Sequence, residues 1–147
     1  MSTLAPSTEA LQAIAARINA GTAYSLDVKA EARELAVDPL EEVTELRVDV
    51  CHESEQQLFE RIDDEGTEHT LRIWIRKKVA ALNGDEVNPL RLLCRQILQQ
   101  VDQYDTQDRR VCVWQSGFES QEVADRTMLY QQRIFVASVI LRVRVVA

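Results

Sequence analysis

The sequence has few of the residues that build common functional sites. Its 147 residues include two histidines, three cysteines and four glycines. Cys51, Cys94 and Cys112 are an odd number and widely spaced, which disfavours a disulfide framework and is typical of reduced cysteines in a protein made in the cytoplasm. The glycines follow neither of the spacings that cradle a phosphate group. We therefore expect no cofactor.

Motifs for metal binding and catalysis are also missing. His52 and His69 have no CxxC or HxxxH partner, so a metal site is disfavoured and a strand end at the surface is the simpler interpretation of His52. The acidic run Asp63, Asp64 and Glu65 is typical of a solvated turn. A GxSxG nucleophile elbow does not occur. The sequence predicts a protein that is not an enzyme, with no catalytic, metal or cofactor residues.

Long apolar runs and basic clusters are lacking as well. The longest apolar run, IFVASVIL, is followed by arginines long before the ~18 residues that a membrane helix needs, and the first residues do not resemble a secretory signal. Acidic residues outnumber basic residues 24 to 17, for a net charge of −7. No Lys/Arg run could neutralise consecutive phosphates, so sequence-specific duplex binding is disfavoured. We expect no membrane partner.

What the sequence does contain is ordinary globular composition. Apolar residues make up 46% and charged residues 28%, as in typical globular domains. The length suits one domain, and no repeat or flexible linker divides the chain. We predict a single domain over residues 1–147.

Two segments have helical periodicity. The first is expected to begin at Ser7, as N-cap, and to end before Gly21; the second is expected to have Asn88 as N-cap and Pro89 at its first helical position. Residues 22–45 could be extended or helical. The predicted buried positions are Leu11, Ile14, Ala15 and Ile18 in the first helix, and Leu90, Leu93, Cys94, Ile97, Leu98 and Val101 in the second.

Four segments are predicted to be strands, and the first two show the alternation of inward and outward residues that strands have. They are residues 45–51, 70–82, 109–117 and 133–147, of which the last is apolar on both faces in its first half. The charged segment 52–69 lies between the first two and is predicted to be a long loop that joins an antiparallel pair. The sequence therefore predicts an α+β fold of two layers, in which a mainly antiparallel sheet packs against two main helices.

Arginines on the outer side of two predicted strands are the most informative polar residues. They could be solvated strand ends that prevent edge-to-edge pairing. They could also form a protein contact surface, because tryptophan and arginine are enriched among interface anchors, and an acidic loop on a neighbouring copy would complement them. The interface candidates are Arg72, Trp74, Arg76, Arg142 and Arg144, with Asp63, Asp64 and Glu65 as the acidic counterpart.

The order of these segments resembles that of tail terminator (tail completion) proteins, which belong to the neck of long-tailed bacteriophages. The likeness runs from about residue 23 onward. The sequence departs from the family pattern at Cys51 and His52, where a proline or small residue is expected, and in the arginines of its last strand. The likeness is carried by Ala32, Arg33, Pro39, Leu40, Val43, Leu46, Val48 and Val50, the LRIWIRKK strand, the NPLRLLCRQILQQV helix, and Phe135 and Ser138 of the last strand.

The resemblance implies a non-enzymatic virion protein that forms a ring, commonly a homohexamer. Such a ring caps the tail tube and joins it to the head connector, and DNA passes through its lumen without sequence-specific binding. The implied partners are further copies of the chain, a tail tube protein, and a head-tail connector or head-closure protein. The implied location is the virion neck, after assembly in the cytoplasm of a host bacterium.

Two alternatives stay open at this point. The first is a head-closure or connector adaptor, which would bind on the capsid side instead of the tube side. The second is of another class: a small phage or bacterial enzyme or regulator with an unrecognised site.

Overall fold

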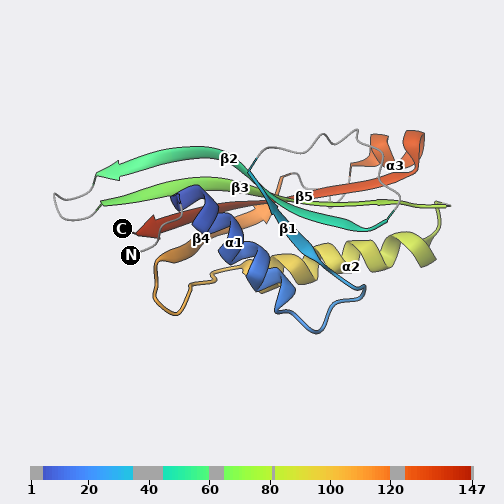
Figure 1. Ribbon diagram of the computed structural model, residues 1–147. Helices are drawn as coiled ribbons and strands as arrows, with labels where there is room; N and C mark the ends of the chain where they lie inside the picture. Colours follow the sequence, from blue (N-terminus) through green and yellow to red (C-terminus); the bar gives the residue numbers. More distant parts are fainter. Residues whose placement is uncertain (1–4, 35–44, 60–64, 81, 120–124, 147) are drawn as a thin grey trace.

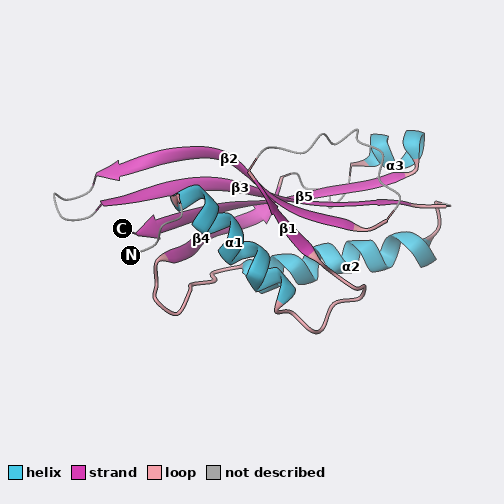
Figure 2. Ribbon diagram, in the orientation of Figure 1, coloured by secondary structure: helices cyan, strands magenta, loops and turns pink. Residues whose placement is uncertain are grey.

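The computed structural model describes residues 5–34, 45–59, 65–80, 82–119 and 125–146. Within these ranges, α1 and α2 lie on one side of a five-stranded sheet and α3 lies on the other side (Figures 1 and 2). The predicted α+β class is confirmed. The elements are α1 (Pro6–Asn19), β1 (Ala30–Arg33), β2 (Arg47–Phe59), β3 (Glu65–Lys78), α2 (Gly84–Val101), β4 (Val111–Phe118), α3 (Arg126–Gln132) and β5 (Ile134–Val146).

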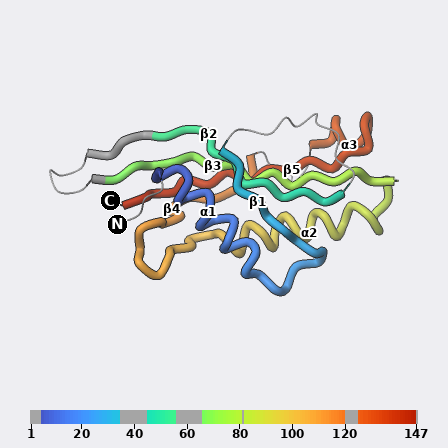
Figure 3. The backbone as a smooth tube through the Cα atoms, viewed as in Figure 1, coloured from blue at the N-terminus to red at the C-terminus, as the bar shows by residue number. Residues whose placement is uncertain are grey.

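The sheet has the strand order β1-β2-β3-β5-β4. The short β1 runs parallel to β2, and every other pair is antiparallel. The long strands β2, β3 and β5 run side by side through the centre of the molecule (Figure 3). Because β1 and β4 end the strand order, they form opposite edges of the sheet.

The core lies between the sheet and the two helices α1 and α2. Alternate strand residues face this layer, as the sequence predicts: Val50 of β2 pairs in register with Ile73 of β3, which pairs with Val139 of β5, and all three are fully buried. The predicted helical stripes are buried too, except that Leu98 is only partly buried. The 3.6-residue and two-residue periods therefore identified the core correctly.

Both predicted helix starts are wrong. Helix α1 has Ala5 as N-cap and Pro6 in its first turn, where the fixed φ of proline suits a helix and its missing N–H is not needed. Helix α2 begins after Asn83, whose side chain accepts a hydrogen bond from the Glu86 backbone N–H at 3.1 Å. Pro89 consequently lies inside the helix. The Asn83 cap stabilises a start more than a turn earlier than predicted.

The loop predicted at 52–69 is also wrong. Strand β2 continues to Phe59 and β3 begins at Glu65, with cross-strand pairs along the hairpin and a register shift between His52 and Ser54. Backbone pairing holds this segment in the sheet, although its polar side chains suggested a loop. Asp63 and Asp64 lie outside the described residues.

A third helix, α3, was not predicted. Asp125 caps it by accepting a hydrogen bond from the Met128 backbone N–H at 3.1 Å, and Arg133 ends it in the left-handed conformation with φ of 58°. Met128 packs with Ile134, Val136 and the partly buried Trp74. Helix α3 therefore covers one end of the sheet face that α1 and α2 leave free.

Candidate interaction surface

The sheet face opposite α1 and α2, here called the second face, carries most of the predicted interface residues. Cross-strand register places Trp74 of β3 beside Ser138 of β5, and Arg72 beside Ile140. Arg142 and Arg144 follow on β5, with the same alternation. Strand alternation places these residues on the side of the sheet away from the helix layer. Their environments, however, differ.

Arg76 is not a surface residue. Its Nη2 lies 3.0 Å from Oδ2 of Asp49, and the two side chains are 0% and 1% exposed. The other oxygen of Asp49 accepts a hydrogen bond from Nε of Arg33 at 2.7 Å. The interpretation of Arg76 as part of an exposed outer face is therefore wrong: it belongs to a buried ion cluster that joins β1, β2 and β3.

Arg72 is also engaged within the subunit. It forms an ion pair with Glu53 and another with Glu119, whose Oε2 lies 2.5 Å from Nη1. Glu119 also accepts a hydrogen bond from the Ser138 hydroxyl at 2.8 Å, and the Arg72 guanidinium lies 5.2 Å from the Trp74 ring centroid.

Electrostatics confirm that this second cluster is internally matched. Burial opposes the charge on Arg72, but the hydrogen bonds that Arg72 donates to Glu119 and Glu53 outweigh that penalty and raise the arginine pKa. The same hydrogen bond from Arg72, with that from Ser138, lowers the pKa of Glu119. The guanidinium and the two carboxylates neutralise one another and are hydrogen-bonded to one another. This cluster therefore connects β3 to β2 and to the segment after β4.

Further along the second face, a tryptophan and an arginine are exposed beside a second arginine that is partly buried. Trp114 of β4 is 53% exposed, and the Arg142 guanidinium lies 5.7 Å from its ring centroid. A register shift between Val113 and Gln115 interrupts the pairing of β4 with β5 at this position. Arg144 lies beside Cys112 in the same register. We call Trp114, Arg142 and Arg144 the Trp–Arg patch.

Sequence reasoning found the two arginines of the patch but missed its tryptophan. The signal was present, since Val111 and Val113 alternate as buried residues and place Trp114 on the opposite side. Because tryptophan is enriched among interface anchors, we treat the exposed Trp114 as a candidate contact residue.

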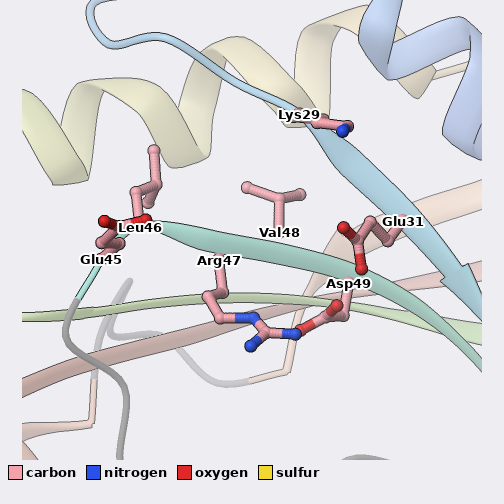
Figure 4. A pocket seen from close by; sticks show the side chains of 7 residues that line it. All are labelled: Lys29, Glu31, Glu45, Leu46, Arg47, Val48 and Asp49. Carbon is pink, nitrogen blue, oxygen red and sulfur yellow. The ribbon is translucent and has the colours of Figure 1, made fainter.

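The other edge of the sheet has a hollow of about 340 Å³ beside the start of β2 (Figure 4). Leu46 and Val48 lie on one side of the β2 ribbon, and Arg47 and Asp49 lie on the other. Sequence reasoning gave no indication of this hollow, because it depends on where β1 approaches β2. We call it the β1–β2 hollow; its lining residues are Lys29, Glu31, Glu45, Leu46, Arg47, Val48 and Asp49.

The two histidines, distant in the sequence, meet on neighbouring strands. His52 Nε2 lies 2.9 Å from His69 Nδ1, and His69 Nε2 lies 2.7 Å from the Thr67 hydroxyl oxygen. His69 is fully buried. Burial lowers its pKa, and the charge of Glu55, whose Oε1 lies 3.7 Å away, acts in the opposite direction. The strand-end interpretation of His52 is wrong.

The histidine pair supplies at most two metal ligands, whereas a protein zinc site takes at least three from the chain. Throughout the described ranges, no group of three or more histidine, cysteine, aspartate or glutamate side chains is arranged to hold a metal ion.

The helices within the described residues are too short or too polar to span a membrane.

Comparison with known proteins gives a structural match. No protein-family model matches the sequence, and no curated protein matches it either. Among solved structures, the fold is similar to a chain in the virion of a native gene transfer agent (GTA) particle, with a TM-score of 0.57 and 14% sequence identity. The similarity covers 95% of this chain and 97% of that chain. At this identity the match establishes a shared fold.

Proposed function

We propose that the protein is a structural subunit of a phage-type virion, and more specifically a tail terminator of the neck. In this role it forms a ring, commonly of six copies, that caps the tail tube and joins the tail to the head connector. DNA passes through the ring without sequence-specific binding. The observation that carries the proposal is the likeness to the virion chain, which spans nearly the whole of both chains.

The side chains of the second face support a structural role. Arg33, Asp49 and Arg76 are held in one ion cluster, and Arg72 and Glu119 belong to another. These charged groups pair with one another across neighbouring strands and so connect the strands of the sheet. They are suited to holding the sheet rigid while its edges make contacts.

The proposed partners are other copies of the chain, a tail tube protein, and a head-tail connector or head-closure protein. Two residues expected at an interface support this proposal, since Arg142 is exposed and Arg144 is partly exposed on the second face. The proposed location is the virion neck, with assembly in the cytoplasm of the host bacterium. The acidic segment Asp63, Asp64 and Glu65 stays a predicted contact.

The test is the assembly state of the purified protein, alone and with isolated tail tubes. We expect light scattering to give a ring mass, and electron microscopy to show rings at one end of the tubes. Tubes of unrelated proteins serve as the control. A chain that stays monomeric and leaves tube ends bare would contradict the proposal. Binding to the head connector but never to tubes would identify a head-closure adaptor instead.

A further inference from the structure

The two edges of the sheet carry unlike surfaces. At the β4 edge, the Trp–Arg patch combines an accessible indole with two guanidinium groups. At the β1 edge, the β1–β2 hollow is bordered by the exposed side chains of Glu31 and Glu45. A closed ring is built from heterologous contacts, in which one patch meets a different patch on the next copy. Unlike surfaces on opposite edges satisfy this requirement.

We propose that the Trp–Arg patch of one copy binds the β1–β2 hollow of the next copy. The inference rests on the proposed ring and names the surfaces that join its subunits. Trp114 is the anchor, and Arg142 and Arg144 pair with the carboxylates at the hollow.

The patch is suited to act as an anchor. Contact between the Arg142 guanidinium and the indole, at 5.7 Å from the ring centroid, orients both groups before a partner arrives. The flanking residues Val111 and Val113 are buried in the core, so they fix the backbone of β4 under the tryptophan. A side chain ordered in advance loses less conformational entropy on binding.

The hollow is suited to receive such an anchor. Its volume of about 340 Å³ falls in the range of pockets that hold small ligands, roughly 300–1,000 Å³. Leu46 is partly exposed and supplies aliphatic surface for an indole. The Glu31 side chain is 52% exposed, and although it lies 3.5 Å from Arg33 it can accept a further hydrogen bond from a guanidinium.

The basic groups of the hollow lie at its margins. Lys29 is near α1 and α2, whereas the Arg47 side chain extends on the other side of β2, toward Asp49 (Figure 4). The carboxylate of Glu31 lies between them. Glu31 lies 3.5 Å from Arg33 of its own subunit, so an arriving guanidinium shares this carboxylate with Arg33. The exposed Glu45 supplies a second carboxylate at the hollow, and opposite charges across the contact also set its register.

The experiment is a charge reversal with rescue in the full-length chain. Arg142→Glu and Glu31→Arg are each expected to weaken subunit association about tenfold, because each places like charges together at the contact. The chain that carries both changes places Glu at 142 opposite Arg at 31 of the next copy, and association should recover. Ring formation is measured by light scattering, alone and on tail tubes.

Matched variants separate the contact from folding and from net charge. Arg91→Glu changes the charge by the same amount on an exposed position of α2 and should leave ring formation unchanged. Trp114→Ala should weaken association while circular dichroism shows a folded subunit, since the indole is half exposed.

The outcomes distinguish this inference from the proposed ring. If the wild-type chain forms rings and Arg142→Glu, Glu31→Arg and Trp114→Ala all leave them intact, the inference fails and the ring stands. Failure of the double variant to recover would also overturn the contact. If Arg142→Glu keeps rings but abolishes tube capping, the patch binds the tube protein and the inference is wrong. A wild-type chain that forms no ring overturns both.

Discussion

The buried ion pair between Asp49 and Arg76 gives the sharpest test of the fold. Asp49→Asn keeps the shape of the side chain but removes the negative charge that lies 3.0 Å from Arg76. Arg76 is fully buried, so the substitution leaves its guanidinium in the core without that carboxylate. Breaking one side of a buried pair costs about 3–5 kcal/mol. We expect the free energy of unfolding to fall by about that amount.

Arg33 offers an internal comparison at the same carboxylate. Its side chain is 36% exposed, whereas Arg76 is 0% exposed. Arg33→Gln removes a partner that water screens, so we expect a loss of about 1 kcal/mol or less. The exposed pair of Arg33 and Glu31, at 3.5 Å, gives the matched control: Glu31→Gln should change stability little.

Urea unfolding followed by circular dichroism measures these differences, provided that the slope of the unfolding free energy against urea stays constant. The expected order of loss is Asp49→Asn, then Arg33→Gln, then Glu31→Gln. If Asp49→Asn cost no more than Glu31→Gln, burial would not govern this cluster, and the assignment of Arg76 as a structural residue would be refuted.

Three further predictions concern the histidine pair, the two sides of β5 and the start of α2. Because the pKa of His69 is lowered in the folded chain, the unfolded state binds the proton more readily, so stability should be retained above about pH 6.5 and fall as the pH drops from there toward the lowered pKa. Urea midpoints at several pH values check this, and His69→Gln, if folded, should have a flatter profile. Leu141 is fully buried beside α1 and α2, so Leu141→Ala should lower the free energy of unfolding by about 2–5 kcal/mol. Ile140 lies on the second face and is partly exposed, so Ile140→Ala should lower it clearly less. Equal losses in urea unfolding would mean that both sides of β5 are equally packed. Asn83→Ala should cost about 1 kcal/mol through loss of the cap, and an unchanged thermal midpoint would show that α2 does not depend on it.

The periodic parts of the fold could be predicted from the sequence. Val48 and Val50 of one strand, like Ile73 and Ile75 of the next, recur at every second residue. This two-residue period predicts which side of a strand faces the core, and it does so without knowledge of the neighbouring strand. The same reasoning failed for residues 52–69, because their mostly polar side chains did not indicate that the segment forms strands. Pairing there is a backbone property fixed by β3, and a local pattern does not contain it.

For the same reason, contacts between residues that are distant in the sequence could not be predicted from a local pattern. His52 and His69 meet only because the hairpin brings neighbouring strands into register. The β1–β2 hollow needs the position of a short parallel strand that has almost no periodicity of its own. Helix α3 spans seven residues, too few to show a helical period, so its cover over Trp74 could not be expected either.

The arginines of β3 and β5 show what the structure adds to such a pattern. Both strands place two arginines on the second face, four residues apart in β3 and two apart in β5, so the sequence treats Arg72, Arg76 and Arg142 alike. In the structure they differ in their partners. Arg76 forms an ion pair with Asp49, and Arg72 forms ion pairs with Glu53 and Glu119. Arg142, in contrast, is exposed and its guanidinium lies over the ring of Trp114. A guanidinium already matched by buried or shielded carboxylates gains little from a partner, because its desolvation is complete and its hydrogen bonds are made. An exposed guanidinium ordered by an indole retains its donors for an incoming carboxylate. Subunit contact should therefore depend on Arg142 and Trp114, and stability on Arg76.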